Sequence, residues 1–96
     1  MEKNWCVYIL RCGDGTLYTG ITDDFSARLR AHRAGKGAKY TRGRGPLEPA
    51  YLEMAESHSA AAKRECQIKK LKKHEKLALC EVWSQGADAI CGDEAL

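Results

Sequence analysis

Long apolar runs and paired cysteines are both missing from this sequence. No apolar stretch approaches the roughly 20 residues that a membrane-spanning helix needs. The first residues, MEKNWCVYIL, lack the charged-then-apolar layout of a secretory signal peptide. Five cysteines are present, an odd number without a CxxC pair. We therefore expect reduced thiols in a cytoplasmic protein rather than a zinc site or a disulfide framework, and no membrane partner.

Two stretches lack charges of one sign. Residues 35–45 carry four basic side chains and no acidic one, whereas residues 84–96 carry three acidic side chains and no basic one. The net charge of the whole chain is only +3, so its uneven distribution is more informative than the total. A basic body with an acidic tail indicates a polyanionic partner, although an ordinary solvated surface would show the same pattern.

The length of 96 residues and the absence of an internal repeat indicate one domain with a modest core. We assign this domain to residues 1–83. Residues 84–96 combine small and acidic residues without periodicity, so we expect a disordered acidic tail there.

Residues 5–21 show the alternation of a β-hairpin, with a turn signal at Gly13–Gly15. With that loop, Tyr8 lies opposite Gly20 and Leu10 lies opposite Tyr18. The two tyrosines are then diagonal neighbours on one face of the sheet. Gly20 leaves space beside the Tyr8 ring, so the face can form the floor of a small polar pocket. The alternative is an ordinary hairpin with two half-buried tyrosines.

A first helix is predicted after the hairpin. Residues 23–24 can cap it, and Gly35 is a suitable residue to end it. Arg28 and His32, spaced i, i+4, lie together on one face of this helix. A strand is then predicted over residues 47–56, where Pro49 implies an edge position.

A second helix begins after a serine cap at position 57 or 59. Ala61, Glu65 and Ile68 follow helical spacing, so Glu65 falls within the apolar stripe. A buried carboxylate must be paired, protonated or bound to a metal, because burying it bare is costly. A salt bridge to Arg28 or to a lysine is the alternative to a metal. A short third helix is predicted over residues 75–83.

The order and spacing of these residues closely resemble the GIY-YIG nuclease superfamily, over residues 5–79. Cys6-Val7-Tyr8 stands where those proteins have Gly-Ile-Tyr, and Tyr18-Thr19-Gly20 stands where they have Tyr-Ile-Gly. Arg28 matches the arginine of the first helix in that family, and Glu65 matches its metal-binding glutamate. The basic loop of residues 35–45 and the second helix look like those of the small standalone bacterial members. Those members are near relatives of the nuclease subunit of eukaryotic junction-resolving complexes.

The sequence also departs from the family pattern. Excision-repair members place a lysine just after Tyr-x-Gly, where this chain has Ile21-Thr22. They also place a tyrosine one helical turn after the arginine, where this chain has His32. Any role of that lysine in ordering the attacking water therefore does not carry over. His32 could relay a proton, although a lone histidine on a helix is more often a hydrogen-bonded surface group.

The resemblance implies an α/β (α+β) domain with the GIY-YIG fold, a three-stranded antiparallel sheet flanked by three helices. It implies a metal-dependent DNA endonuclease, structure-selective and acting in DNA repair or recombination. Glu65 would hold Mg²⁺ or Mn²⁺, and Arg28 would contact the non-bridging phosphate oxygens. Tyr18 would orient the water or the phosphate. Tyr8 is the candidate general base, but only if the metal or neighbouring cations lowered its pKa from about 10.

Contacts to the DNA backbone are expected from the basic loop and from the end of the second helix. The residues predicted to make them are Lys36, Lys39, Tyr40, Thr41, Arg42, Arg44, Lys69 and Lys70. Such contacts give affinity without sequence readout. Two alternatives remain: a non-catalytic nucleic-acid-binding module, and an adaptor that binds a protein partner in a repair complex. The presence of Glu65 favours the enzyme, since binding alone does not need it.

Overall fold

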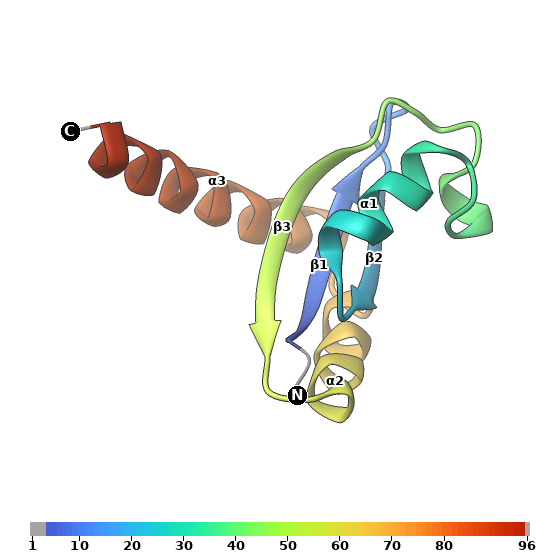
Figure 1. The fold of residues 1–96 in the computed structure, drawn as a ribbon, viewed down its shortest axis with the longest axis horizontal. Coiled ribbons are helices and arrows are strands. Elements are labelled where there is room, and N and C mark those ends of the chain that lie inside the picture. The colour runs from blue at the N-terminus through green and yellow to red at the C-terminus, as the bar shows by residue number, and fades with distance from the viewer. Residues whose placement is uncertain (1–3, 96) are drawn as a thin grey trace.

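The sheet at the centre of the molecule has three antiparallel strands in the order β2-β1-β3 (Figure 1). The computed structural model describes residues 4–95, and side chains as far as Gln85. The strands are β1 (Trp5–Arg11), β2 (Leu17–Thr22) and β3 (Glu48–Ala55). Three α-helices and one 3-10 helix complete the fold: α1 (Phe25–Arg33), η1 (Lys39–Thr41), α2 (His58–Lys69) and α3 (Lys73–Ala95). The predicted fold class is confirmed.

The hairpin has the predicted register. Tyr8 pairs with Gly20 and Leu10 pairs with Tyr18, and the Cys12 N–H donates to the Thr16 carbonyl at 2.9 Å to close the loop. A Cβ atom at Gly20 would lie 2.5 Å from the Tyr8 hydroxyl, which no real side chain tolerates. Glycine is therefore required at this position because the Tyr8 ring lies directly over the β2 backbone.

Helix caps set where α1 and α2 begin. The Asp24 carboxylate accepts a hydrogen bond from the Ala27 N–H at 3.1 Å. The Ser57 hydroxyl oxygen accepts one from the Ala60 N–H at 3.1 Å, which selects Ser57 of the two serines considered. Both are standard N-cap bonds that satisfy amide groups left free at a helix start.

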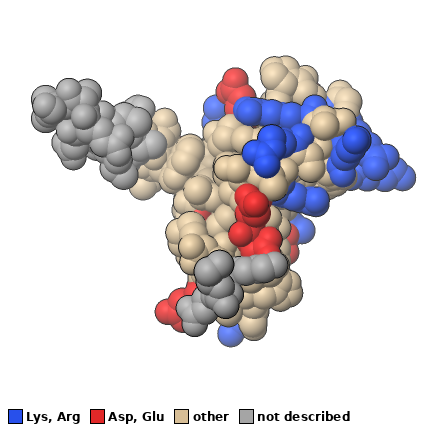
Figure 2. Space-filling view, in the orientation of Figure 1, with Lys and Arg blue, Asp and Glu red and all other residues tan. Residues whose placement is uncertain are grey.

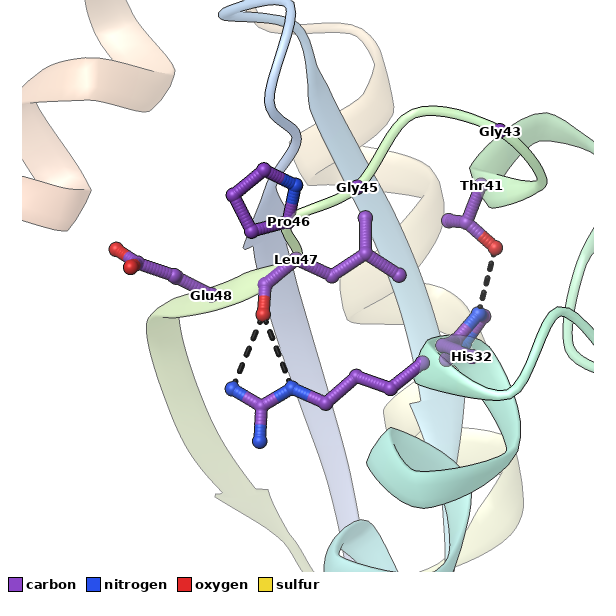
Figure 3. A pocket seen from close by; sticks show the side chains of 8 residues that line it. His32, Thr41, Gly43, Gly45, Pro46, Leu47 and Glu48 are labelled. Atoms are coloured by element: carbon purple, nitrogen blue, oxygen red, sulfur yellow. Dashed lines mark hydrogen bonds between the residues drawn. The ribbon is translucent and has the colours of Figure 1, made fainter.

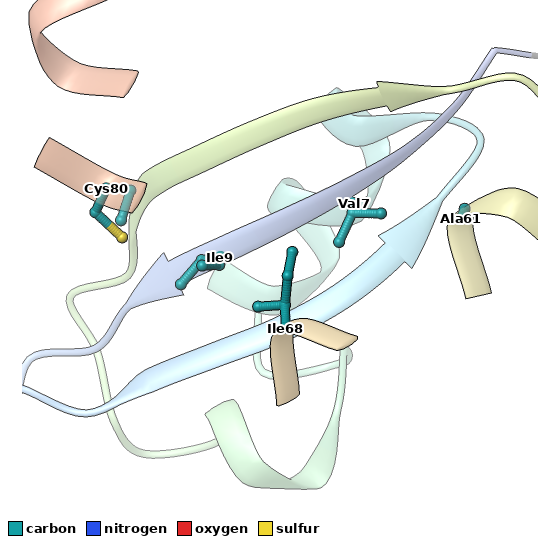
Figure 4. Close-up of a cluster of buried hydrophobic side chains, with 6 residues drawn as sticks. Val7, Ile9, Ala61, Ile68 and Cys80 are labelled. Carbon is teal, nitrogen blue, oxygen red and sulfur yellow. The ribbon is translucent and has the colours of Figure 1, made fainter. Parts of the chain in front are cut away.

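The two faces of the sheet are covered by different helices. Val7 and Ile9 pack against Ala61 and Ile68 of α2 and Cys80 of α3, which together form the apolar core (Figure 4). The intervening residue Tyr8 points to the other face, because strand side chains alternate. There it meets α1, which lies in front of the strands in Figure 1. α1 and α2 therefore lie on opposite faces of the sheet.

The third helix differs from the sequence prediction. A short helix was expected to end at residue 83, whereas α3 continues to Ala95. Side chains after Gln85 lie outside the described part of the chain, so the proposed division into residues 1–83 and 84–96 stays a prediction. Among the described residues, no helix is both long and apolar enough to cross a membrane.

Candidate active site

Four of the five predicted catalytic residues gather on the α1 face of the sheet. Tyr8 comes from β1, Tyr18 from β2, and Arg28 and His32 from α1. The Tyr8 hydroxyl and His32 Nε2 are 2.9 Å apart. The Tyr8 and Tyr18 ring centroids are 6.3 Å apart, so the prediction that the tyrosines share a face is confirmed. The Arg28 side chain lies near enough to the Tyr8 hydroxyl for its positive charge to act on the pKa of Tyr8.

Burial and charge set the protonation of this cluster. Tyr8 and His32 are only 1% and 2% exposed. Burial raises the pKa of Tyr8, and the nearby Arg28 side chain offsets this only in part. Burial, together with the positive charge of Arg28, lowers the pKa of His32. At neutral pH the site therefore holds a protonated phenol beside a neutral imidazole. From the sequence, Tyr8 could serve as a base only if a metal or neighbouring cations lowered its pKa. Arg28 alone does not bring the pKa of Tyr8 below its ordinary value.

Thr41, which the sequence predicted to contact DNA, is buried in the structure. It is 2% exposed, and its Oγ1 lies 2.9 Å from His32 Nδ1. The same hydroxyl donates to the Ala38 carbonyl at 2.9 Å. A hydroxyl within a glycine-rich basic loop looks like a phosphate ligand in the sequence. In the structure it faces inward instead and contacts the histidine, a role that no pattern in the sequence indicated.

Glu65 lies on α2 and therefore belongs to the other face of the sheet. It is half-buried, with a side chain that is 22% exposed, as expected from its place between Ala61 and Ile68. Its Oε2 lies 3.4 Å from the Nζ of Lys69, so the ion pair with a lysine that the sequence left open is present. The convergence of Glu65 on the tyrosine cluster stays a prediction. α2 packs against β1 and against β2, which is an edge strand of the sheet. To reach the tyrosine cluster on the α1 face, the Glu65 side chain would have to extend around that edge.

The donor set suits a divalent ion held by few protein ligands. Within the described part of the chain, no three His, Cys, Asp or Glu side chains gather into a ready-made metal site. One carboxylate combined with water and substrate phosphate is, however, a usual way for proteins to hold Mg²⁺. Glu65 offers such a hard oxygen ligand, so the residues fit an ion that arrives with the substrate.

The basic loop is linked to the cluster through an aromatic stack. Tyr40 stacks on Tyr18 with ring centroids 5.9 Å apart and an interplanar angle of 26°. The guanidinium of Arg44 lies 4.5 Å from the Tyr40 ring centroid and forms a 2.5 Å ion pair with Asp14. Hydrogen bonds from Thr16, followed by those of Arg44, lower the pKa of Asp14 to about 2. Lys and Arg side chains gather around α1 and this loop in Figure 2.

Two pockets flank this region. One of about 430 Å³ is lined by His32, Thr41 and Leu47, among others (Figure 3). At its edge, Arg33 donates from Nε at 3.1 Å and from Nη2 at 3.0 Å to the carbonyl of Leu47, the residue before β3. The sequence did not indicate this link between α1 and the start of β3. A second pocket of about 210 Å³ brings Lys73 and Lys76 of α3 beside Tyr40.

The sequence and structure are similar to those of known proteins. The model of the GIY-YIG catalytic domain matches residues 4–78. The UPF0213 protein OB0043 of Oceanobacillus iheyensis is 49% identical over 85 residues, which cover 88% of this chain and 99% of that protein. A UPF0213 protein of Syntrophus aciditrophicus is 54% identical over 80 residues, which cover 82% of this chain and 91% of that protein.

Two solved structures share the fold. The solution structure of the UPF0213 protein BH0048 of Bacillus halodurans has a TM-score of 0.54 at 43% identity, covering 82% of this chain and 84% of that one. Protein EF2693 of E. faecalis has a TM-score of 0.60 at 35% identity, covering 88% of this chain and 90% of that one. GIY-YIG nucleases generally depend on a divalent metal. The resemblance predicted from the sequence is confirmed, and the chain belongs to the GIY-YIG family of nuclease domains.

Proposed function

We propose that this protein is a metal-dependent endonuclease that hydrolyses DNA phosphodiester bonds, with a preference for branched, flapped or nicked DNA in repair or recombination. The observation that carries the proposal is the 2.9 Å contact between the Tyr8 hydroxyl and His32 Nε2, with Arg28 against the same hydroxyl. A protonated phenol beside a neutral imidazole forms a path along which a proton can leave an attacking water.

The proton path needs two coupled transfers. The water gives a proton to the Tyr8 hydroxyl oxygen as it attacks phosphorus, and Tyr8 passes its own proton to His32 Nε2. The directions of the pKa changes support this order, because Tyr8 retains its proton and His32 is free to accept one. From the sequence, Tyr8 could act as a base only if its pKa were lowered. With His32 as the final proton acceptor, that condition no longer applies. Once His32 is protonated, the negative charge developing on the phosphate offsets repulsion between the imidazolium and Arg28.

The remaining residues bind and orient. Arg28 would contact the non-bridging oxygens of the phosphate, because its guanidinium is always charged and forked. Tyr18, only partly buried beside Tyr8, would orient the water or the phosphate. Glu65 would hold Mg²⁺ or Mn²⁺, which when bound supplies Lewis-acid stabilisation of the phosphate.

The DNA backbone would follow the exposed basic loop. Lys36, Lys39 and Arg42 are exposed on it and carry its positive charge. Arg44 is paired with Asp14 and Lys69 is paired with Glu65, so we expect weaker phosphate contacts from these two residues. Tyr40, which stacks on Tyr18, shares a pocket with Lys73 and Lys76 of α3, and these three residues offer further contacts. Lys70, exposed at the end of α2, offers another. These contacts would position any DNA sequence alike.

The pairing of Glu65 with Lys69 is also compatible with a second candidate function. A carboxylate satisfied by a lysine of its own helix needs no metal, as in a nucleic-acid-binding module or an adaptor that has lost turnover. Because Lys69 is largely exposed, we expect this i, i+4 pair to stabilise the helix by only about 0.3–0.5 kcal/mol. A metal ion could therefore displace Lys69 at little cost, and the pair does not decide between the two functions.

Glu65→Gln distinguishes them. Flap, nicked, branched and duplex DNAs would be incubated with Mg²⁺ or Mn²⁺ and the wild-type protein, the variant, or the matched control Glu81→Gln on the exposed side of α3. We expect cleavage by Glu65→Gln to fall by several orders of magnitude, since a principal electrostatic stabiliser is lost. Its DNA affinity without metal should stay the same or rise slightly, and Glu81→Gln should behave as wild type.

Three outcomes would contradict the proposal. A folded Glu65→Gln protein that cuts at the wild-type rate would remove Glu65 from the mechanism. A wild-type protein that binds the DNAs but cuts none of them would favour the binding module. A lowered melting temperature with unchanged cleavage would assign Glu65 a structural role.

A further inference from the structure

The segment between α1 and η1 encloses the far side of the His32 ring. A Cβ atom at Gly37 would lie 2.3 Å from His32 Nδ1 and 2.7 Å from its Cγ, so the loop backbone rests directly on the ring. Thr41 Oγ1 lies 2.9 Å from Nδ1, and His32 and Thr41 are each 2% exposed. The loop that carries the exposed basic residues therefore also holds a buried histidine. Figure 3 shows the His32–Thr41 contact from the adjoining pocket.

The hydrogen bonds around Thr41 decide which ring nitrogen carries the proton. The hydroxyl of Thr41 has one proton, and it donates that proton to the Ala38 carbonyl at 2.9 Å. Toward His32 the hydroxyl oxygen can then only accept, so Nδ1 must carry the proton at their 2.9 Å contact. In the neutral imidazole Nε2 is left as the acceptor, and it lies 2.9 Å from the Tyr8 hydroxyl.

The opposite tautomer fits less well. If Nδ1 were unprotonated, the Thr41 hydroxyl and the Ala38 N–H, which lies at 3.4 Å, would both donate to its single lone pair. The Ala38 carbonyl would then lose its 2.9 Å donor and keep only the Thr41 N–H at 3.1 Å. That arrangement therefore exchanges a short hydrogen bond for the long 3.4 Å contact. The long 3.4 Å contact is the only one that the favoured arrangement gives up.

We propose that Thr41 is a positioning residue that holds His32 in the Nδ1–H tautomer, so that Nε2 faces Tyr8 as a proton acceptor. Its catalytic consequence rests on the proposed nuclease function, but the tautomer itself does not. Tyr8, His32, Thr41 and the Ala38 carbonyl form one directed chain of hydrogen bonds from β1 into the basic loop. A residue in the DNA-facing loop thereby sets the chemistry of a residue in the cluster.

The first test reads the tautomer without DNA or metal. Two-bond ¹H–¹⁵N correlation spectra of uniformly ¹⁵N-labelled protein at pH 7.5 distinguish protonated from unprotonated ring nitrogens, and loss of signals in His32→Gln assigns those of His32. We expect Nδ1–H in the wild-type protein and in Thr41→Ser. In Thr41→Val, which keeps the shape but lacks the hydroxyl, we expect a mixture of tautomers. A wild-type protein with the Nε2–H tautomer would overturn the proposal, even if the valine variant did not fold.

The second test measures cleavage of a DNA that the wild-type protein cuts. Thr41→Val should lower kcat by about 10- to 100-fold, part of the 10²–10⁴-fold that a positioned proton acceptor supplies. KM and metal-free DNA affinity should be unchanged, and Thr41→Ser should restore kcat. A folded Thr41→Val protein with wild-type kcat would overturn the catalytic role of Thr41. A tautomer change in a protein that cuts no DNA would support the tautomer assignment and contradict the proposed function instead.

Discussion

At the Tyr8 hydroxyl, burial and positive charge act on the same pKa in opposite directions. Burial has the larger effect and raises it, although the nearby Arg28 side chain acts to lower it. The phenol therefore retains its proton in the folded molecule at neutral pH. His32, whose pKa is lowered by burial, is the neutral group in position to receive that proton. The acid–base character of the cluster belongs to the Tyr8–His32 pair rather than to either residue.

The lowered pKa of His32 predicts a loss of stability in acid. Above the ordinary histidine pKa of 6.5 the buried neutral ring contributes its full stability. As the pH falls below that value the unfolded chain takes up a proton before the folded one does, so stability is lost until the lowered folded pKa is passed. The slope from one group is at most about 1.4 kcal/mol per pH unit. Urea unfolding of the wild-type protein between pH 7.5 and 5 should show this fall.

His32→Gln provides the control for this effect. Glutamine keeps hydrogen-bonding groups near Tyr8 and Thr41 but does not titrate, so the free energy of unfolding should decline less steeply with acid. The variant is expected to be less stable at pH 7.5, and only the difference in slope is diagnostic. Equal slopes for the two proteins would show that His32 is not buried as a neutral group.

At the scale of elements, the hairpin was predictable and the placement of the helices was not. Residue alternation and the Gly13–Gly15 turn set the register, and the structure confirms it. The periodicity of α2 placed Glu65 in its apolar stripe, and the structure agrees. The apolar stripe of α2 could in principle pack on the face of the sheet that carries Val7 and Ile9, or on the face that carries Tyr8. Both strand faces contain apolar residues, so the pattern alone could not decide.

Loops were the least predictable elements. The sequence of residues 35–45 indicated a phosphate-binding loop, and its exposed basic side chains agree with that interpretation. The inward turn of Thr41 toward His32 depends on a contact between residues nine positions apart in the chain, for which a single sequence carries no periodic signal. The Tyr18–Tyr40 stack likewise joins β2 to η1 through the tertiary fold alone.

Neutralising the basic loop should weaken DNA binding without changing sequence preference. Replacing Lys36, Lys39 and Arg42 by glutamine should reduce the slope of log Kd against log salt by roughly one unit per lost phosphate contact. Adding Arg44→Gln should contribute less, because Arg44 is paired with Asp14. Fluorescence anisotropy over a salt series measures the slope, with Lys63→Gln on α2 as the matched control. An unchanged slope in the triple variant would assign the loop to solubility rather than binding.

For the whole molecule, the apolar core and the polar cluster lie on opposite faces of the sheet. The core of Val7, Ile9, Ile68 and their neighbours holds α2 and α3 against one face of the sheet. The other face carries the polar cluster under α1, next to the basic side of the surface in Figure 2. Substitutions in the cluster are therefore expected to alter chemistry more than stability, provided that they preserve side-chain shape.

The cleavage rate of Tyr8→Phe shows whether the Tyr8 hydroxyl takes part in DNA hydrolysis. The variant keeps the ring over Gly20 and loses the hydroxyl, and Tyr51→Phe removes the hydroxyl of a tyrosine bonded to Glu53 on β3 as a matched control. On a DNA that the wild-type protein cuts with Mg²⁺ or Mn²⁺, we predict that Tyr8→Phe is slower by about 10²- to 10⁴-fold. Its metal-free DNA affinity should be unchanged, and Tyr51→Phe should cut normally. A folded Tyr8→Phe protein with the wild-type rate would contradict the account.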